Sequence, residues 1–204
     1  MLLQIHPENP EGRKIKQAVE ILKKGGVIIY PSDSVYALGC DIKQAKAIEK
    51  ICKIRGWKPQ KANLSFICKD ISEVSEYTPP IDNQTFKLLK RNAPGPFTFI
   101  LKAGNKVVKL LKNKRKTIGI RIPSHNIIEA IIAELGNPIL STSLKADDEI
   151  LEYFTDAEDI HDDFKNQVDL VIDGGVGNNV PSTVVDCTEF PPVIIREGAG
   201  ELVY

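Results

Sequence analysis

The sequence predicts a single α/β domain, 1–204, built on one twisted sheet of mixed parallel and antiparallel strands. Stretches in which apolar residues recur at helical spacing alternate with short runs of β-branched residues, without an internal repeat, a linker or a low-complexity segment. A chain of 204 residues can also bury most of its apolar surface around one core. We therefore expect helices to surround the sheet.

The N-terminal half is expected to begin with a helix that leads directly into a strand. Ile15, Val19 and Leu22 recur at helical spacing, and Gly25-Gly26 ends this helix before the apolar run 27–30. The further elements expected before residue 103 are a helix around 45–52, a strand at 64–68, a short helix capped by Asp70, a helix at 85–90 and a strand at 98–102.

The C-terminal half continues this alternation. A stripe of apolar residues from Ile127 to Leu135 predicts a helix that stops at Gly136. The strands expected around this helix are 117–122, 139–142, 170–173, 183–186 and 193–196. The acidic stretch 147–165 is expected to form a short helix on a surface segment.

Composition narrows the classes of function. The chain has 27 basic and 27 acidic residues, so no overall field attracts nucleic acid or a membrane surface. Its longest apolar runs are only a few residues, and its N-terminus lacks the apolar core of a signal peptide, so we expect a cytoplasmic protein. The four cysteines include no Cys-x-x-Cys pair and the three histidines are scattered. We therefore predict reduced thiols in or near the core, and we predict no metal site built by the protein.

Polar side chains gather directly after the first predicted strand. They are Ser32, Asp33, Ser34 and Tyr36. A buried strand that ends in hydroxyls and a carboxylate places hydrogen-bonding groups at a sheet edge, where open α/β folds bind small ligands. The same residue types are ordinary turn formers, so a simple turn is the alternative interpretation.

Phosphate groups would have to be held by side chains, because the sequence has neither a Walker loop nor a Gly-x-Gly-x-x-Gly motif. Guanidinium groups bind phosphate oxygens through two parallel hydrogen bonds, and lysine adds a movable point charge. The candidate cations are Lys53, Arg55, Arg121 and Arg196. Lys53 and Arg55 could instead stabilise the C-terminal end of a helix. Arg121 lies within an apolar strand, where its charge needs a partner or a cavity.

Seven blocks of the sequence follow one another in the order of a known family. The first, 25–39, is similar to a motif that reads Pro-Thr-Glu/Asp-Thr-x-Tyr-Gly-Leu-Gly. The others are Lys53-Ile-Arg55, Pro94-Gly-Pro-Phe-Thr98, Thr117-Ile-Gly-Ile-Arg-Ile-Pro123 with His125, Ser141-Thr-Ser143, Pro181-Ser-Thr-Val-Val-Asp186 and Ile195-Arg-Glu-Gly198. In these blocks the chain resembles the YrdC-like family of threonylcarbamoyl-AMP synthases, from about residue 25 to residue 198.

Three departures from the synthase pattern bring the chain closer to the YciO-type branch. Ser143 replaces the asparagine of a Ser-x-Asn motif, Gly56 replaces the proline after Lys-x-Arg, and Ser34 replaces the second threonine of the first motif. Asparagine offers a carbonyl and an amide group, whereas serine has one short hydroxyl, so the contact at position 143 changes. Members of this branch need not share the synthase activity.

The resemblance implies a concave open sheet whose cavity holds the ligands, and a nucleotidyltransferase reaction. In that reaction threonine, bicarbonate and ATP, with Mg²⁺, yield threonylcarbamoyl-adenylate and pyrophosphate, on the way to a modified adenosine in transfer RNA. Such chemistry depends on positioning and charge neutralisation more than on acid or base groups. By matching position, Lys53, Arg55 and Arg121 would be catalytic, Ser141, Ser143, Ser182 and Arg196 would bind the nucleotide, and Ser34, Tyr36 and Thr117 would bind the substrate.

Two alternatives stay open at this point. The chain could be a double-stranded RNA or tRNA-binding protein without synthase activity, because the family is associated with RNA binding and basic residues concentrate at 50–61 and 109–121. It could also be a YciO-type enzyme that acts on a related carbamoyl or modified-nucleoside substrate. The roles of two aromatic residues also stay open. The only tryptophan, Trp57, could stack on a base or simply pack. Capping or packing explains the position of His125 as well as catalysis does.

Overall fold

The computed structural model describes residues 1–59, 62–111, 116–145 and 153–204. Its strands are β1 (Leu2–Gln4), β2 (Val27–Tyr30), β3 (Ala37–Asp41), β4 (Ser65–Ile67), β5 (Phe97–Lys102), β6 (Thr117–Arg121), β7 (Ile139–Ser143), β8 (Leu170–Asp173), β9 (Thr183–Asp186) and β10 (Val193–Arg196). Its helices are α1 (Gly12–Lys23), α2 (Ala45–Ile54), α3 (Ile71–Ser75), α4 (Asn83–Asn92), α5 (Asn105–Leu111), α6 (Asn126–Leu135) and α7 (Ala157–Phe164).

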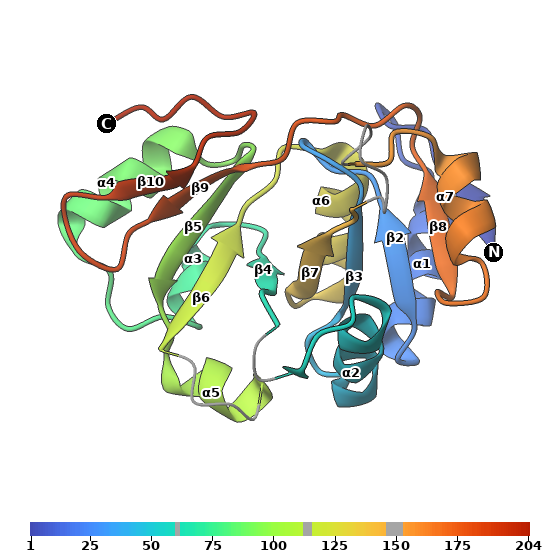
Figure 1. Cartoon of the computed structure of the whole chain (residues 1–204), viewed down its shortest axis with the longest axis horizontal. Coiled ribbons are helices and arrows are strands. Elements are labelled where there is room, and N and C mark those ends of the chain that lie inside the picture. Colours follow the sequence, from blue (N-terminus) through green and yellow to red (C-terminus); the bar gives the residue numbers. More distant parts are fainter. Residues whose placement is uncertain (60–61, 112–115, 146–152) are drawn as a thin grey trace.

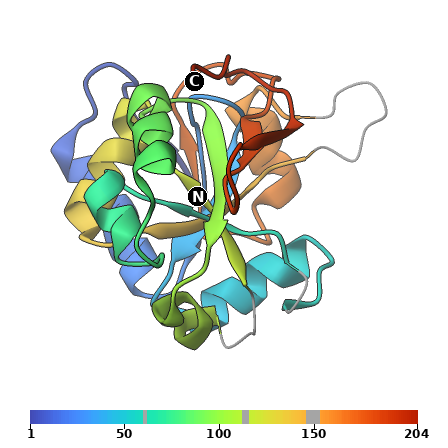
Figure 2. The ribbon, with the colours of Figure 1, turned by 90° about the vertical axis from the view of Figure 1, so that its left-hand side faces the viewer.

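Within the described residues, ten strands form one sheet in the order β1-β8-β2-β3-β7-β4-β6-β5-β9-β10 (Figure 1). The pairs β1–β8, β2–β8, β4–β6 and β5–β9 are parallel, and the others are antiparallel. This confirms the predicted mixed sheet. In Figure 2, α3 and α4 lie together on one side of β5, with β9 and β10 on the other.

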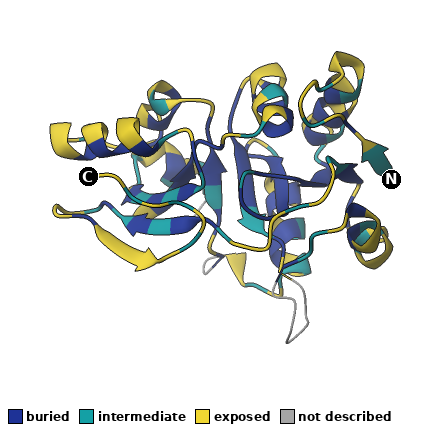
Figure 3. Cartoon of the chain, turned by 90° about the horizontal axis from the view of Figure 1, so that it is seen from above, coloured by how far each residue is buried: buried dark blue, intermediate teal, exposed yellow. Residues whose placement is uncertain are grey.

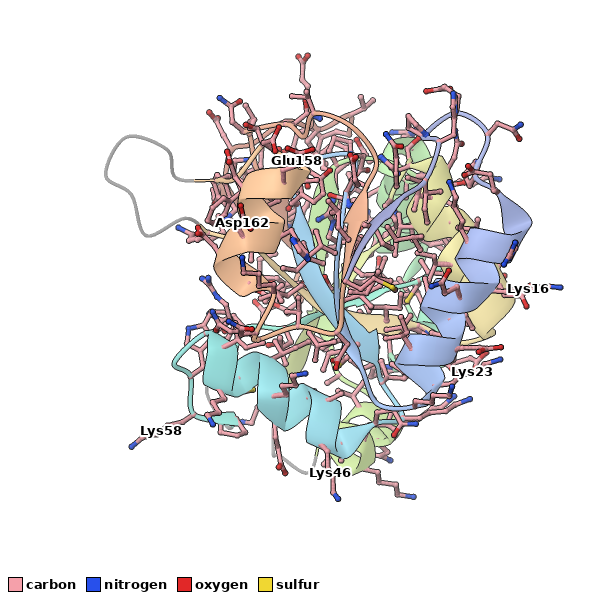
Figure 4. All side chains as sticks on the ribbon, turned by 90° about the vertical axis from the view of Figure 1, so that its right-hand side faces the viewer. Lys16, Lys23, Lys46, Lys58, Glu158 and Asp162 are labelled. Carbon is pink, nitrogen blue, oxygen red and sulfur yellow. The ribbon has the colours of Figure 1, made fainter. Side chains whose placement is uncertain are left out.

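Side chains of β2 alternate between two hydrophobic clusters, as the two-residue period of a strand requires. Val27 and Ile29 join the larger cluster with residues of α2 and α7, whereas Ile28 and Tyr30 join the second cluster with residues of α1 and α6. Figure 4 shows α1 on one side of the sheet and α2 and α7 on the other, with their labelled charged residues pointing outward. At β2 the sheet is therefore covered on both faces, and Figure 3 shows the buried strands of this part of the sheet between helices with exposed outer faces.

The helix ends follow the sequence signals. Gly25 and Gly136 adopt left-handed conformations, with φ of +85° and +74°, at the ends of α1 and α6. The Asp70 carboxylate caps α3 by accepting from the amide of Glu73 at 2.8 Å. The helix expected within 147–165 is confirmed over α7, whereas residues 146–152 lie outside the described residues.

Three elements were not predicted: β1, β3 and α5. The most consequential is β3, whose five residues are all buried and which follows the polar residues 32–36 directly. All four cysteines are buried and outside any disulfide, and burial raises the pKa of the Cys187 thiol to about 12. In the part of the chain that the structure describes, no helix is both long and apolar enough to cross a membrane.

Candidate functional site

A cavity of about 450 Å³ lies against the sheet, lined by side chains of β4, β5, β6, β7, β9 and β10 and by residues just after α2. This volume lies within the usual range for small-molecule sites. The strand period decides which side chains reach it: Thr117, Gly119 and Arg121 of β6 line the cavity, whereas Ile118 and Ile120 between them pack into the core. The sequence block 117–123 thus divides into a binding face and a core face.

Gly119 keeps the floor of this cavity open. It pairs with Ser65 of β4, and a Cβ atom at Gly119 would lie 2.5 Å from the Ser65 Oγ and 3.3 Å from the Thr98 Cγ2. Any other residue would push into neighbouring strands or into the cavity. Gly119 was not among the predicted site residues, although a glycine inside a strand commonly marks a close approach.

The lining of the cavity is cationic. Arg55, Arg121, Lys145 and Arg196 all contribute to it, and among the described residues that line it there is neither aspartate nor glutamate. Hydroxyl groups surround these cations: Ser65, Thr98, Thr117, Ser141, Ser143 and Ser182. Positive charge together with many short donors suits an anionic ligand rich in acceptor oxygens.

Arg121 is held by a buried ion pair. Its Nη2 donates to Asp33 Oδ1 at 2.5 Å and to Ser34 Oγ at 2.9 Å, and the two charged side chains are each 7% exposed. The other carboxylate oxygen of Asp33 accepts from the amide of Ser124 at 2.9 Å. The Nε of Arg121 is buried without a partner. Arg121 is therefore neutralised on one side and retains an unused donor.

Arg196 is oriented by the backbone of the neighbouring segment. Its Nη2 donates to the carbonyl oxygen of Ser182 at 2.7 Å. The Ser182 hydroxyl is in turn 2.8 Å from the Thr98 Oγ1, which joins β10, the entry to β9 and β5 at one wall of the cavity. The Nε of Arg196 donates to the same carbonyl at 3.3 Å, so the guanidinium is fixed through Nε and Nη2 while Nη1 is left for a ligand.

Ser141 has a committed proton. Its Oγ donates to the carbonyl of Leu38 at 2.8 Å, so the phenol of Tyr30, 2.6 Å away, must donate to the same Oγ. Burial raises the pKa of Tyr30 to about 12, which keeps this phenol protonated. Ser141 is left with one lone pair, so it can only accept a hydrogen bond from a ligand.

Three predicted site residues lie outside the cavity lining. Lys53 is exposed on α2, where it belongs to the solvent-facing stripe of Lys46, Glu49 and Lys50. Ser34 and Tyr36 are fully buried. Ser34 contacts the cavity only through Arg121, and the Tyr36 hydroxyl donates to the carbonyl of Gly175 at 2.8 Å. The other predicted site residues do line the cavity: Arg55, Thr117, Arg121, Ser141, Ser143, Ser182 and Arg196.

The structure also adds lining residues that the sequence analysis missed, including Asn63, Ser65, Lys145 and Tyr153. The Nζ of Lys145 lies 5.5 Å from the centroid of the Tyr153 ring, and the two residues form an isolated antiparallel bridge. Only the position of Lys145, two residues after Ser143, was an available signal. Tyr153 is brought to the site by tertiary structure.

His125 stands at the start of α6 but its side chain makes no capping hydrogen bond. Its Nδ1 is buried without a partner, and burial lowers the pKa of the imidazole. His125 is not among the residues that line the cavity. Across the described ranges, no cluster of three or more His, Cys, Asp or Glu side chains could hold a metal ion.

Comparison with known proteins identifies close relatives. The family model for Sua5, YciO and YrdC, described as "Telomere recombination", matches residues 20–198. YciO of Escherichia coli (strain K12) is 50% identical over 200 residues, which cover 97% of this chain and 95% of that protein. The crystal structure of E. coli YciO superimposes with a TM-score of 0.90 at 47% identity, over 98% of this chain and 97% of the other.

Two more distant relatives carry a functional name or ligand. A threonylcarbamoyl-AMP synthase of Bacillus subtilis (strain 168) is 32% identical over 187 residues, 91% of this chain and 53% of the synthase. Pyrococcus abyssi Sua5, in a crystal structure complexed with L-threonine, gives a TM-score of 0.85 at 27% identity, over 97% of this chain and 57% of that one. The chain thus spans just over half the length of these two proteins.

Proposed function

The chain belongs to the Sua5/YciO/YrdC family, and on that premise we propose that its cavity binds ATP and threonine for adenylyl transfer of the threonylcarbamoyl-AMP synthase type. The observation that carries this proposal is the convergence of four cations and a ring of hydroxyls on one cavity with no acidic residue in its described lining. A nucleoside triphosphate supplies the matching negative charge and acceptor oxygens.

In the proposed reaction, the amine of threonine and bicarbonate form a carbamate with loss of water. A carbamate oxygen then attacks the α-phosphorus of ATP, the bond to the bridging oxygen breaks, and pyrophosphate leaves. Lys145 and Arg196 would hold phosphate oxygens and neutralise the charge that develops on them. Mg²⁺ would arrive with the phosphates of ATP, because triphosphates are its usual ligands in such sites.

The Arg121 end of the cavity suits the amino acid. The unused Nε of Arg121 can donate to a carboxylate or carbamate oxygen, while Asp33 and Ser34 fix its guanidinium from behind. Ser141 accepts, so it would receive a hydroxyl or N–H donor of the substrate. Ser34 would therefore act by positioning Arg121. Because the chain has Ser143 where the synthases have asparagine, a related carbamoyl or modified-nucleoside compound is the alternative substrate within this proposal.

Nucleotide binding is tested with the variant Arg196→Gln and with the same substitution at a control arginine outside the cavity. We expect Arg196→Gln to weaken the binding of a non-hydrolysable ATP analogue by about tenfold to a hundredfold, because a hydrogen bond to a charged group contributes about 1.5–3 kcal/mol. Isothermal titration calorimetry measures this change. The control is Arg91→Gln on α4, because Arg91 also donates to a main-chain oxygen, that of Tyr204, but does not line the cavity. Equal affinities of the two variants would contradict the proposal.

RNA binding is a second candidate, supported by the cations Arg55, Lys145 and Arg196 in the cavity lining. Such binding would be largely electrostatic, and the net charge of zero limits its strength. Titration of the wild type with duplex RNA and with the ATP analogue separates the two candidates. Duplex RNA that binds with steep salt dependence, alongside no binding of the ATP analogue, would favour this second function.

A further inference from the structure

Trp57 is carried to the wall of the cavity by the glycine that precedes it. α2 ends at Ile54 with Arg55 as its C-cap, and Gly56 adopts a left-handed conformation with φ of +64°. The amide of Gly56 donates to the Lys53 carbonyl at 3.1 Å and the amide of Trp57 to the Cys52 carbonyl at 2.8 Å. These two bonds form a Schellman motif.

Proline could not make this turn. Its ring holds φ near about −65°, and it has no N–H to donate to the Lys53 carbonyl. Gly56 therefore does more than depart from the Lys-x-Arg-Pro pattern of the synthases, because its left-handed conformation sets the path that the chain takes after α2. Trp57 is the first residue on that path.

The side chain of Trp57 is held on two sides. It is half-buried against the larger hydrophobic cluster, and the guanidinium carbon of Arg55 lies 5.2 Å from its ring centroid. Both residues line the cavity. An arginine over an indole ring is attracted to the ring face, so the two planar groups together present a surface that is both cationic and aromatic.

We propose that Trp57 and Arg55 form the wall on which a planar nitrogen heterocycle of the ligand, its nucleobase, stacks. The inference rests on the proposed function, and it assigns the base to the α2 end and the phosphates to Arg196 and the hydroxyls. Asn63 also lines the cavity, and its amide carries both donor and acceptor atoms suited to the edge of a base. Stacking on an aromatic side chain tolerates any base, so the wall selects planarity and leaves base identity to Asn63.

The fluorescence of the unmodified protein tests this directly, because Trp57 is its only tryptophan. We expect the ATP analogue to quench the emission on binding. Tripolyphosphate, which carries the charges without a base, is expected to bind without quenching. A short single-stranded oligoadenylate forms a third arm: quenching by the oligonucleotide but not by the analogue would indicate that the base comes from RNA.

Substitutions supply the matching affinities. Trp57→Leu should weaken binding of the analogue by about fivefold to a hundredfold, since base–aromatic stacking contributes about 1–3 kcal/mol, and Trp57→Phe should retain most of the affinity. Phe86→Leu is the control, because Phe86 is an aromatic residue on α4 that is 43% exposed and does not line the cavity. Tripolyphosphate affinity should be unchanged in all three variants.

Two variants at Gly56 test the positioning. No heavy atom lies within 4 Å of a Cβ built at Gly56, so Gly56→Ala adds only backbone strain and should keep both the cap bonds and the quenching. Gly56→Pro removes the cap and should lose quenching although Trp57 is still present, with circular dichroism confirming that the variant folds. Binding of the analogue without quenching in the wild type, or with unchanged affinity in Trp57→Leu, would overturn the inference and leave the proposed function standing. Failure of all nucleotides to bind would overturn both.

Discussion

Arg121→Ala is expected to lower the free energy of unfolding by about 3–5 kcal/mol, because removal of one partner of a buried ion pair leaves the other charge uncompensated. Asp33 would remain buried with one oxygen on the Ser124 amide and no cation beside the other. Urea denaturation followed by circular dichroism measures this effect. Loss of nucleotide binding in this variant would then reflect unfolding as well as a lost contact.

A double variant separates the effect of the uncompensated charge from the effect of losing the contacts between Asp33 and Arg121. Asp33→Asn combined with Arg121→Met removes both charges, so this protein should be more stable than either single variant. The control is Lys165→Ala, because Lys165 pairs with Asp162 at 2.9 Å with both side chains well exposed. Such a surface pair contributes at most about 1 kcal/mol. If the two single-variant losses simply add in the double variant, the ion pair is not the cause.

Ser143→Asn is expected to raise threonine-dependent pyrophosphate release by about tenfold to a hundredfold, because a regained hydrogen bond to a charged group contributes about 1.5–3 kcal/mol. Ser143 is half-buried at the end of β7 and lines the cavity, so an amide there faces the ligand. The matched control is Ser143→Leu, which adds similar bulk without the amide. Gly56 and Ser34 also depart from the synthase pattern, and because neighbouring positions couple, they should reduce this gain. Equal rates for the asparagine and leucine variants would show that the amide is not the missing group.

Much of the fold was readable because its signals are local. The apolar stripe of α6, the left-handed Gly136 that ends it and the β-branched run of β2 each specify their own element. β3 was missed for a physical reason: it follows the polar residues 32–36 without a break, and both of its faces are buried, so it shows no alternation. β1 has only three residues and pairs with the distant β8, which no local pattern encodes.

The residues that line the site could be predicted only in part from the sequence, because strand register and helix phase decide which side chains face the cavity. Every second residue of β6 faces the cavity, a pattern that the sequence block contained. Lys53 was misplaced in the cavity although its spacing from Lys46, Glu49 and Lys50 marks the exposed stripe of α2. Ser34, predicted to bind the substrate, lies beneath Arg121 and outside the cavity lining. Lys145 and Tyr153 could be assigned to the cavity lining only from the folded structure.

At Arg121 the family motif and the structure lead to the same conclusion, whereas at Gly56 they differ. The apolar neighbours of Arg121 required a partner or a cavity, and the structure supplies both: Asp33 on one side and the cavity on the other. At Gly56 the family pattern anticipates a proline, whereas the left-handed turn observed there excludes one. The departure is therefore a structural feature of this chain with consequences for Trp57.

The central claim is that the cavity joins ATP and threonine, and pyrophosphate release tests it most directly. Purified wild-type protein would be incubated with ATP, Mg²⁺, threonine and bicarbonate, and with each of the last two omitted in turn. The account predicts that pyrophosphate forms only when threonine and bicarbonate are both present, that Arg196→Gln reduces its rate and that Ser143→Asn raises it. No threonine- and bicarbonate-dependent pyrophosphate from either the wild type or Ser143→Asn, in proteins that are folded and bind the nucleotide, would contradict it.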